Sequence, residues 1–506
     1  MSLDQVRVRL GGLWGLWHNR SMVIFRKILF YLFLALYLVL CPIIILYAFG
    51  YIFTPKGEEG FAKTGLIHIE TLPANAFLSI AGKRYAEKTP ATIRNLLPGT
   101  YDMKILLRGH RPWERKVEVE PGKAVNFEKV LLVPQNLKIR TLVAKPFEDL
   151  WPVAGTRYLL LKRTERAGDL WVFDWKNEVS RQVLPEDASF AAMKLMRVFR
   201  VKDSPFVILQ VKASDGMRFL GCQLDKESLA VTDLSRLFMK GEPDEISWEG
   251  GRPDYLFALY GQDLLRLDLE KMTVLPDFLS KIRGFGLFKN KVYALRGSSI
   301  FRLGFGSKPG EEALVEKGVF LENLFSGEEK YKIDFISNNA ICFLGERGEL
   351  FSNALPYRFV DEGVRGYQTD SDGRKVALWQ EGRVGVLDFE KPERKKEFFE
   401  RGPEIEWIFE KGKNIRQAYF VCDASYILFC DDGEISLARL GERESFPEKL
   451  VRVREGSGFF YAEKTGKLYF LESSRGELVA ADILPEGVTF SGVFGELEKE
   501  TQEAMK

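Results

Sequence analysis

The chain is poor in histidine, the residue most used for acid-base catalysis and metal binding. Of its 506 residues only three are histidines, and none lies beyond residue 110. They are His18, His68 and His110. A Ser-His-Asp triad, a Cys-His pair and a His-rich zinc or copper site all need an imidazole. Such sites are therefore excluded from everything that follows residue 110.

Cysteine is also scarce. Five residues are scattered along the chain, at Cys41, Cys222, Cys342, Cys422 and Cys430. This spacing does not provide a disulfide framework. Cys422 and Cys430 are close enough in sequence to be paired across a hairpin. A two-residue loop at Ala424 and Ser425 would instead set Cys422 opposite Ile427, so the sequence leaves this disulfide open.

Motifs of nucleotide and redox chemistry are missing as well. There is no Walker loop, no dinucleotide fingerprint at a strand-to-helix junction and no Cys-x-x-Cys. Charge is balanced, with 73 basic and 71 acidic residues and a net charge of +2, so we expect no nucleic-acid partner. From the sequence we assign no catalytic residue, no metal-binding residue and no cofactor.

One long apolar run interrupts this mixed composition. Residues 28–53 read ILFYLFLALYLVLCPIIILYAFGYIF and contain no charged residue. A helix needs about 20 apolar residues to cross a hydrocarbon core of roughly 30 Å, so the run predicts a transmembrane helix. A cleaved signal peptide is the alternative. Its apolar region should be only about 7 to 15 residues long and should end in a small-x-small site.

Charges beside this run predict its orientation. Five basic residues and one acidic residue precede it: Arg7, Arg9, Arg20, Arg26, Lys27 and Asp4. After it, two lysines are offset by two glutamates. The positive-inside rule then places residues 1–27 in the cytoplasm. We expect a single-pass protein of the cell membrane whose bulk, after a linker at residues 54–64, is extracytoplasmic.

Residues 65–134 alternate apolar and polar side chains in short runs separated by turn residues. Five such runs predict the strands of a small β domain. They are GLIHIET (65–71), AFLSIAG (76–82), YDMKILLRG (101–109), ERKVEVEPG (114–122) and NFEKVLLVP (126–134). Residues 97–99, Leu-Pro-Gly, make a tight turn between two of them.

The same stretch resembles the PEGA domain family. That pattern runs through Pro-x-x-Ala, a Gly-Lys hairpin, a Thr-Pro, a Leu-Pro-Gly-x-Tyr turn and a glycine before an aromatic. The matching residues are Pro73, Ala76, Gly82, Lys83, Thr89, Pro90, Leu97, Pro98, Gly99, Tyr101 and Gly109. The name-giving motif departs as Pro73-Ala74-Asn75-Ala76, and His110 replaces the commoner aromatic. The resemblance implies a small β-sandwich-like module of prokaryotic envelope and surface-layer-associated proteins, without catalytic residues.

An internal repeat runs through residues 137–495. Each unit has a run of β-branched and aromatic residues, a loop with a glycine, and a second such run. The eight marker glycines are Gly168, Gly216, Gly261, Gly297, Gly348, Gly382, Gly433 and Gly476. They lie between 34 and 51 residues apart, similar to the roughly 40 to 50 residues of a four-stranded propeller blade. A glycine also suits the tight turn between the second and third strands of a blade.

This repeat predicts a mainly β fold that ends in a β-propeller. Each unit has room for a strand before the pair, as at residues 332–338, and for one after it, as at residues 395–400. Eight blades are favoured, seven are possible if one unit is degenerate, and two stacked sandwiches are the alternative fold. Closure of the array protects the sheet edges.

Two acidic turns and six tryptophans are the remaining candidate site residues. Asp370-Ser371-Asp372-Gly373 faintly resembles the start of a calcium loop but lacks the distal glutamate, so we interpret it as a hairpin turn. Asp431-Asp432-Gly433 is interpreted in the same way. The tryptophans are interpreted as blade core first and as carbohydrate-stacking platforms second. They are Trp151, Trp171, Trp175, Trp248, Trp379 and Trp407.

These parts together predict a non-enzymatic envelope protein anchored in the membrane. The PEGA-like module would serve as spacer or wall contact, and the propeller as an interaction platform for an envelope protein or a cell-wall or surface glycan. The alternative is a carbohydrate-active hydrolase or lyase with carboxylates in the propeller channel. An assembly factor shares the fold by analogy alone. The charged tail at residues 496–506 carries no recognisable sorting signal.

Overall fold

The structure is a computed structural model of two compact units, residues 1–136 and 137–506. It describes residues 3–53, 61–185, 189–226, 231–317, 329–336, 341–352, 358–370, 372–389, 405–441 and 447–484. The predicted strand at residues 395–400 and the predicted tail at 496–506 lie outside the described residues.

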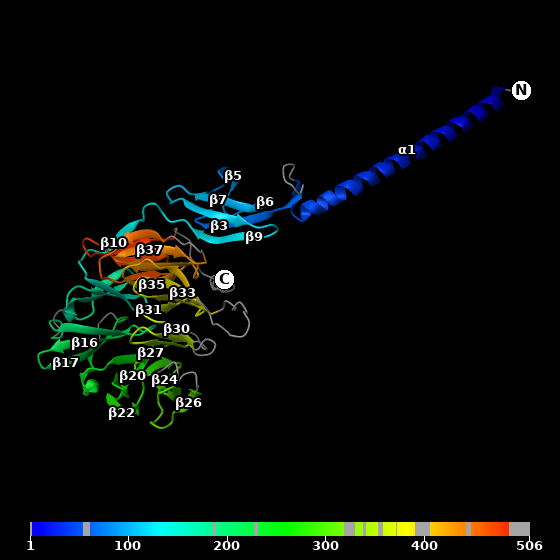
Figure 1. Ribbon diagram of the computed structural model, residues 1–506. Coiled ribbons are helices and arrows are strands. Elements are labelled where there is room, and N and C mark those ends of the chain that lie inside the picture. Colours follow the sequence, from blue (N-terminus) through cyan, green and yellow to red (C-terminus); the bar gives the residue numbers. More distant parts are fainter. Residues whose placement is uncertain are drawn as a thin grey trace. The chain divides into compact units, whose positions relative to one another are not determined.

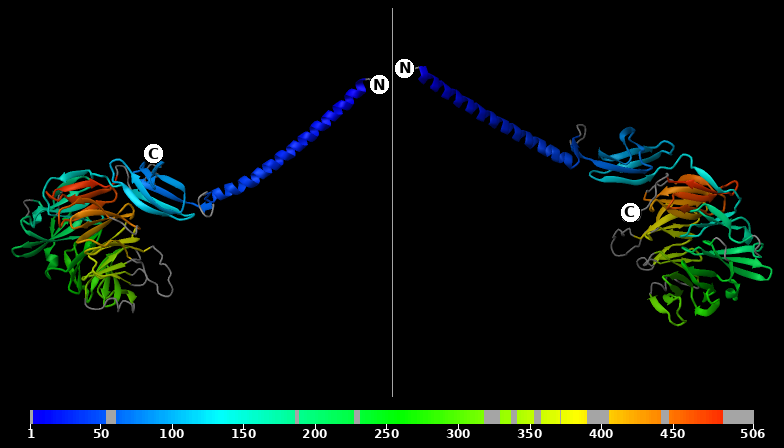
Figure 2. Two further views of the ribbon diagram at one scale, coloured as in Figure 1. Left: turned by 45° about the horizontal axis from the view of Figure 1, so that its top comes forward. Right: turned by 180° about the vertical axis from the view of Figure 1, so that it is seen from behind.

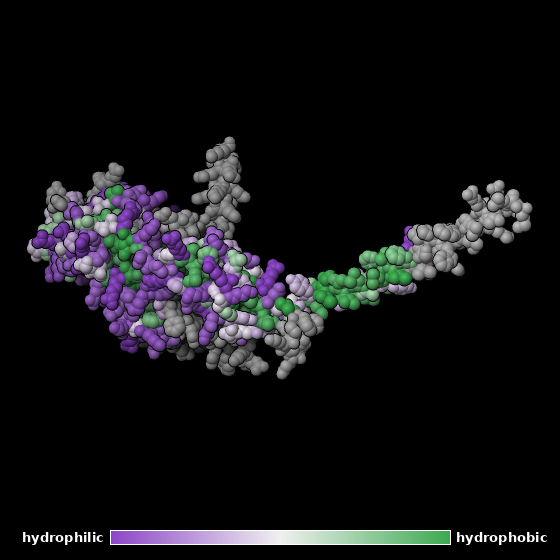
Figure 3. Space-filling model, turned by 90° about the horizontal axis from the view of Figure 1, so that it is seen from above, coloured by the Kyte–Doolittle hydropathy of each residue, from purple (hydrophilic) through white to green (hydrophobic). Residues whose placement is uncertain are grey.

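The first unit begins with one long helix. Helix α1 spans Leu3–Ala48, so most of the predicted cytoplasmic segment is helical as well. Its stretch Phe25–Ala48 has a mean hydropathy of 2.8 and is long and apolar enough to cross a membrane. Large apolar side chains project from it without burial, such as Phe30 at 63% exposure. Figure 3 shows this stretch in green against the mostly purple surface of the β domains. The helix is therefore a candidate membrane span.

The helical part of the apolar run ends before residue 53. The helix closes at Ala48, and Gly50 takes a φ of 78°, which costs glycine little because it has no Cβ. The next residues form strand β1 (Tyr51–Phe53), which pairs antiparallel with β2 (Phe61–Lys63) inside the predicted linker. An apolar run alone does not distinguish a helix from a strand, so the predicted boundary was wrong.

A small β sandwich of two sheets follows. One sheet has the order β6-β3-β9 and the other β5-β4-β7-β8. The strands are β3 (Gly65–Leu72), β4 (Phe77–Ile80), β5 (Lys83–Lys88), β6 (Ala91–Leu96), β7 (Gly99–Leu106), β8 (Trp113–Val119) and β9 (Ala124–Leu131). The first and last of them, β3 and β9, pair in parallel. Both sheets bury side chains in one core, which includes Ile67, Leu78, Ile105 and Val130. The predicted β-sandwich module is thereby confirmed.

Two strands of this module, β5 and β6, were not predicted. Strand β5 lies at a sheet edge, and nearly all of its side chains are exposed, so it carries no alternation of apolar and polar residues. In β6 the alternation is interrupted by the exposed Arg94 and Asn95, and Asn95 has a φ of 62°. A hydrophobic pattern detects a strand only where one of its faces is buried.

The second unit consists of four-stranded antiparallel sheets. The described residues form eight of them between Ile139 and Asp482. The first four sheets contain β11 (Asp149–Pro152), β12 (Tyr158–Lys162), β13 (Leu170–Asp174) and β14 (Val179–Gln182); β15 (Lys194–Arg200), β16 (Phe206–Ala213), β17 (Gly216–Gln223) and β18 (Val231–Asp233); β19 (Glu245–Glu249), β20 (Arg252–Tyr260), β21 (Asp263–Asp268) and β22 (Thr273–Leu279); and β23 (Gly284–Phe288), β24 (Lys291–Arg296), β25 (Ser299–Gly304) and β26 (Ala313–Lys317).

The other four sheets follow the same pattern. They contain β27 (Tyr331–Phe335), β28 (Ile341–Gly345), β29 (Leu350–Ser352) and β30 (Arg358–Asp361); β31 (Gly366–Thr369), β32 (Lys375–Trp379), β33 (Val384–Asp388) and β34 (Glu406–Phe409); β35 (Ile415–Val421), β36 (Tyr426–Asp431), β37 (Glu434–Arg439) and β38 (Glu448–Arg452); and β39 (Phe459–Ala462), β40 (Lys467–Leu471), β41 (Leu478–Asp482) and β10 (Ile139–Val143). The predicted strand at residues 332–338 corresponds to β27.

The last of these sheets closes the circle. Its order is β10-β41-β40-β39, so a strand from the start of the unit pairs with three strands from its end. First strands of neighbouring sheets contact each other, as β11 does β39 and β23 does β27, which makes the first strand of each sheet the inner one. Figures 1 and 2 show the sheets following one another in sequence around the circle. The unit is a β-propeller, as predicted.

The eight marker glycines occupy equivalent places in the propeller. Each lies at the turn between the second and third strands of a different described sheet, the sheet closed by β10 included. Gly297 joins β24 to β25 with a φ of 57°, and Gly433 joins β36 to β37 with a φ of 75°. A side chain is disfavoured at such angles, which explains the glycine at the six marker positions with positive φ; Gly168 and Gly382 are the two without it.

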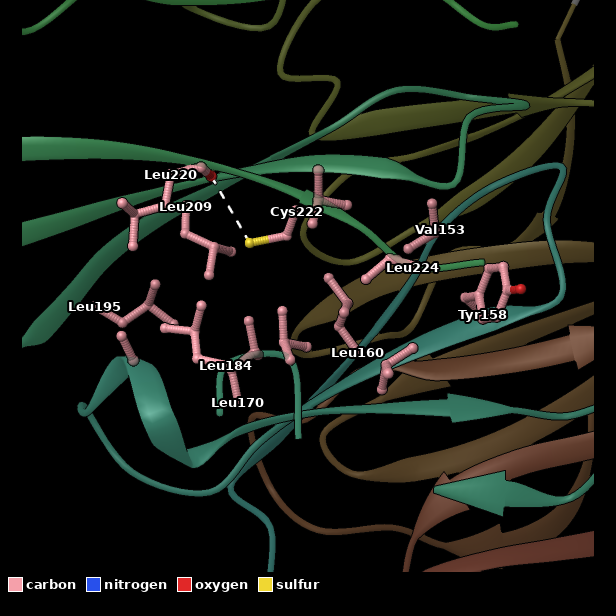
Figure 4. Close-up of a cluster of buried hydrophobic side chains, with 14 of the residues drawn as sticks. Val153, Tyr158, Leu160, Leu170, Leu184, Leu195, Leu209, Leu220, Cys222 and Leu224 are labelled. Carbon is pink, nitrogen blue, oxygen red and sulfur yellow. Dashed lines mark hydrogen bonds between the residues drawn. The ribbon is translucent and has the colours of Figure 1, made fainter. Parts of the chain in front are cut away.

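Neighbouring sheets bury their apolar faces against each other. Figure 4 shows the cluster between the β11–β14 and β15–β18 sheets, in which Leu160 and Leu170 from the first face Leu209 and Cys222 from the second. The Cys222 thiol lies 3.9 Å from the Leu220 carbonyl oxygen, and burial raises its pKa to about 12. At neutral pH this thiol stays protonated, so it is a packing group rather than a reactive one.

The predicted two-residue hairpin near Cys422 and Cys430 was wrong. Four residues, 422–425, join β35 to β36, and Ile427 pairs with Phe420. Cys422 and the two residues after it all have φ between 51° and 58°, which makes the turn longer than the sequence suggested. Cys422 therefore lies in the turn, whereas Cys430 pairs with Gln417. The two cysteines therefore form no disulfide with each other.

Candidate binding site in the propeller channel

A hollow of about 420 Å³ lies against the inner strands of the propeller. Its wall comes from the inner strands β35, β39, β11 and β15 and their adjoining loops, which belong to four consecutive sheets. The side chains that give it chemical character are Asp149, Trp151, Arg200, Lys202, Arg416 and Gln417. The sheet closed by strand β10 is one of the four, so the hollow forms only when the circle is complete.

Asp149 stands at the start of β11 and is held by three donors. Its Oδ1 accepts hydrogen bonds from the backbone N–H of Leu150 (2.8 Å) and of Gly458 (3.0 Å). Its Oδ2 accepts one from Nε1 of Trp151 (2.7 Å). The carboxylate thus ties β11 to the segment before β39 and fixes the indole at the wall of the hollow. With both oxygens engaged, it positions its neighbours.

Arg200 ends strand β15 and points its charge at the same wall. Its Nη1 donates to the backbone oxygen of Pro152 (3.1 Å), and the guanidinium carbon lies 5.7 Å from the centre of the Trp151 ring. Burial lowers the pKa of Arg200, while the charge of Asp149 acts in the opposite direction. Protein surrounds this group, yet the side chain keeps contact with solvent in the hollow. It remains cationic, because an arginine is not deprotonated near neutral pH.

Strand β35 supplies the opposite wall. Nη1 of Arg416 donates to the Gly456 oxygen (3.0 Å), and Oε1 of Gln417 accepts from the Phe459 N–H (3.0 Å). The Tyr419 hydroxyl donates to the Phe459 oxygen (3.2 Å), and burial raises its pKa. Side-chain to backbone hydrogen bonds therefore join β35 to β39 as Asp149 joins β39 to β11.

The hollow has more positive than negative charge. Its described lining includes three cationic residues, Arg200, Lys202 and Arg416, and one acidic residue, Asp149, whose oxygens already accept three hydrogen bonds. A cleft lined by one sign of charge concentrates ions of the opposite sign. The arrangement can therefore bind an anion, and among the residues that the structure describes its wall has Asp149 as the one carboxylate.

A second polar cluster lies among the inner strands β19, β27 and β31. Nζ of Lys332 is 3.0 Å from Oδ2 of Asp334, which also accepts a hydrogen bond from the Tyr367 hydroxyl (2.6 Å). Burial raises the pKa of Glu245 to about 7, and the charge of Lys332 acts in the opposite direction. The charge of Asp334 raises the pKa of Lys332. The positive charge of Lys332 thus acts on the carboxyl groups of both Glu245 and Asp334.

Both acidic turns are hairpin turns, as interpreted from the sequence. Oδ1 of Asp370 accepts from the backbone N–H of Arg374 and Lys375, between β31 and β32. Oδ1 of Asp431 accepts from the backbone N–H of Lys413 and Asn414. Within the ranges that the structure describes, no group of three or more His, Cys, Asp or Glu side chains is arranged to hold a metal ion.

The tryptophans divide between core and channel. Trp248 is 1% exposed and donates from Nε1 to Oγ of Ser204 (3.2 Å), which confirms the core interpretation for this residue. Trp151 lines the hollow and also packs against the apolar cluster between the β11–β14 and β15–β18 sheets. Trp407 is partly buried, and the centre of its ring lies 4.0 Å from the guanidinium carbon of Arg383. His68 and His110 both belong to the sandwich module, where Nδ1 of His68 lies 2.8 Å from Oγ1 of Thr92.

Sequence reasoning singled out only one residue of the hollow, Trp151. Asp149, Arg200 and Arg416 are ordinary charged residues in a chain that has 144 of them, 73 basic and 71 acidic. A positional signal was available, however. Each of the three lies on the first strand of its repeat unit, and first strands converge on the channel of a propeller.

Comparisons with known proteins agree with this division of the chain. The PEGA domain family matches residues 64–134, which are the sandwich module. No curated protein matches the sequence. The solved structures that resemble it include PorZ, a bacterial surface component of the type IX secretion system of Porphyromonas gingivalis, at 14% identity and a TM-score of 0.37. The match covers 66% of this chain and 42% of PorZ, so the chain spans less than half of that protein.

Two further solved structures cover nearly their whole length. Hsv2 of Kluyveromyces lactis matches at 8% identity and a TM-score of 0.39, with 61% of this chain and 98% of that one. The β-propeller domain of Swd1 from Myceliophteria thermophila matches at 8% identity and a TM-score of 0.37, with 69% and 99% covered. At these scores the likeness adds nothing to the fold that the strand pairing establishes.

Proposed function

We propose that this chain is a membrane-anchored, extracytoplasmic envelope protein whose propeller is a non-enzymatic interaction platform. Three features support the proposal: the candidate membrane span Phe25–Ala48, the PEGA domain at residues 64–134 and the closed propeller. The observation that carries it is the hollow, which offers cations and an aromatic wall. Its partner would be an envelope protein or a cell-wall or surface glycan, with the PEGA module as spacer or wall contact.

The hollow supports a platform better than a hydrolase. A glycosidase needs two carboxyl groups, about 5 to 10 Å apart, that are free to exchange protons or to attack the sugar. In the part of the chain that the structure describes, the wall of the hollow has one carboxylate, Asp149, and hydrogen bonds occupy both of its oxygens. Its role is to hold Trp151 and to join two sheets.

One observation favours the alternative, a carbohydrate-active hydrolase or lyase. Burial raises the pKa of Glu245 to about 7, and the nearby charge of Asp334 acts in the same direction. A carboxyl group with a raised pKa is typical of a general acid. Release of reducing sugar from envelope glycans by the native chain, lost in Glu245→Gln and kept in Glu249→Gln, would establish the enzyme and overturn the platform.

Site-specific crosslinking in the intact membrane tests the platform. A photoreactive residue at position 202 lines the hollow, whereas one at position 212 on β16, the second strand of its sheet, is exposed and is not part of the lining. We expect position 202 to form an adduct with a protein or glycan of the envelope and position 212 to form none. Equal adducts from both positions, or none from position 202, would count against a channel-centred platform.

Thiol labelling tests the proposed orientation. Four of the five native cysteines are buried and the fifth, Cys41, lies in the candidate span, so background labelling is low. On intact cells a membrane-impermeant maleimide should label Lys212→Cys and leave Ser2→Cys unlabelled until the cells are opened. The reverse pattern would place the propeller in the cytoplasm.

A further inference from the structure

The hollow has the size of a small-ligand site. Its volume of about 420 Å³ falls within the roughly 300 to 1,000 Å³ that is common for small-molecule pockets. This volume suits a small molecule or one unit of a longer polymer. Four consecutive sheets contribute to the wall.

The cationic side chains of this wall have N–H donors that can bind an anionic ligand. Arg200 and Arg416 each give one Nη1–H to a backbone oxygen, of Pro152 and Gly456 respectively. A guanidinium carries five N–H donors, so both can keep these bonds and still bind an anion. Lys202 adds an ammonium group from the loop that follows β15. A carboxylate or a phosphate is the group that such donors recognise best.

The aromatic wall distinguishes a sugar from a bare ion. Asp149 fixes the Trp151 indole through Nε1 (2.7 Å), and the Arg200 guanidinium lies near the same indole (5.7 Å). An inorganic ion would use the cations and leave the indole without a role. A sugar ring that carries an acidic group would use both, with its apolar C–H face on the indole and its charge at the guanidinium.

We propose that the channel hollow binds one unit of an acidic saccharide, with its carboxylate or phosphate at Arg200, Arg416 and Lys202 and its ring on Trp151. This inference rests on the proposed function, because it names the ligand class of the platform. It also assigns roles to the residues around the ligand. Asp149 and Gln417 position the wall, and the three cations select charge.

Titration of the full chain in zwitterionic lipid nanodiscs tests the inference. The probes are a galacturonic acid trisaccharide, the neutral galactose trisaccharide of equal length, glucose 6-phosphate and inorganic phosphate. We expect the acidic sugars to bind, the neutral one to bind at least about tenfold more weakly, and inorganic phosphate to bind weakest. The two acidic sugars distinguish a carboxylate ligand from a phosphate one.

Variants connect the binding to the hollow. Arg200→Gln and Lys202→Gln should each weaken acidic saccharide binding about tenfold, and Arg200→Lys should lose less than Arg200→Gln because it keeps the charge. Lys212→Gln removes an exposed lysine of β16 that does not line the hollow, and it should leave saccharide binding unchanged. Lys202 has the fewest structural duties, so its variant gives a result even if Arg200→Gln unfolds the propeller.

The outcomes separate this inference from the proposed function. Equal affinity for acidic and neutral trisaccharides, or binding unchanged in Lys202→Gln and Arg200→Lys, would overturn the acidic-saccharide site. If no saccharide binds while position 202 still crosslinks an envelope protein, the inference fails and the platform stands. Failure of both experiments overturns both.

Discussion

The two β domains close in a similar way over very different lengths of chain. In the sandwich module the first and last strands, β3 and β9, pair in parallel within about 70 residues. In the propeller β10 pairs with β41 from the other end of the unit. The entropy cost of loop closure rises only slowly with chain length, so the longer closure costs little more than the shorter one. The two domains differ in how much of their structure depends on this closure.

The interiors differ as well. The module has one apolar core shared by both of its sheets. The propeller has separate apolar clusters between neighbouring sheets, and polar side chains gather where its inner strands meet. The stability of such an array is close to a sum of the contacts between neighbouring sheets. Side chains at the centre are not needed for that packing, so they are available for a ligand. The comparison explains why the candidate site lies in the second unit.

Removal of the closing strand should have the largest effect on the propeller. A chain that begins at residue 137 keeps β10, and one that begins at residue 144 lacks it. Without β10 the edge of β41 is unpaired, and we expect the free energy of unfolding to fall by about 3 to 5 kcal/mol. Urea denaturation of the two chains measures this. Equal midpoints would show that closure contributes little.

A core truncation in each domain tests whether the two units are independent. Trp248→Ala should cost about 3 to 5 kcal/mol and Ile69→Ala about 2 to 5 kcal/mol, since both side chains are almost fully buried. Hydrogen exchange should show lost protection only in the propeller for the first and only in the module for the second. Loss of protection in both units from either variant would contradict the division of the chain.

Close packing of sheets around the channel is the target of a third variant. A Cβ at Gly284 of β23 would overlap the backbone oxygen of Tyr331 on the next sheet, whereas one at Gly306 would meet no atom within 4 Å. Gly284→Ala should therefore cost about 1 to 3 kcal/mol. Gly306→Ala is the matched control and should leave thermal unfolding unchanged. Equal shifts would mean that β23 and β27 are not tightly packed.

The smallest expected effect is a pH dependence from Glu245. Burial raises its pKa from 4.5 to about 7. The folded chain therefore holds an extra proton between these values, and stability falls as the pH rises through this window. With solvent screening we expect about 1 to 2 kcal/mol less stability at pH 8 than at pH 5. Denaturation across this range should show a shallower slope for Glu245→Gln, and parallel slopes would contradict the burial.

Sequence reasoning succeeded where a pattern repeats. The alternation at residues 65–71 and most of the marker glycines reflect local requirements, namely one buried face and a turn with positive φ. It failed at β5, whose edge position removes the need for an apolar face. It also failed at the end of helix α1, where apolar residues continue past Gly50 into a strand.

Most residues of the candidate site could not be predicted from the sequence, for a related reason. Arg200 and Arg416 are 216 residues apart, and only closure of the propeller brings both to one wall. No local sequence pattern indicates that Arg200 and Arg416 line the same wall. The charge balance of the whole chain, +2, also hides the local excess of cations in the hollow. Long-range topology therefore supplies what composition and periodicity do not.

A structure of the full chain with a galacturonic acid trisaccharide tests the account most directly. The account predicts one sugar ring against the Trp151 indole, with its carboxylate within about 2.7 to 3.2 Å of a nitrogen of Arg200 or Arg416. The trisaccharide found elsewhere on the propeller, or a hollow that stays free of it at saturating concentration, would contradict the account.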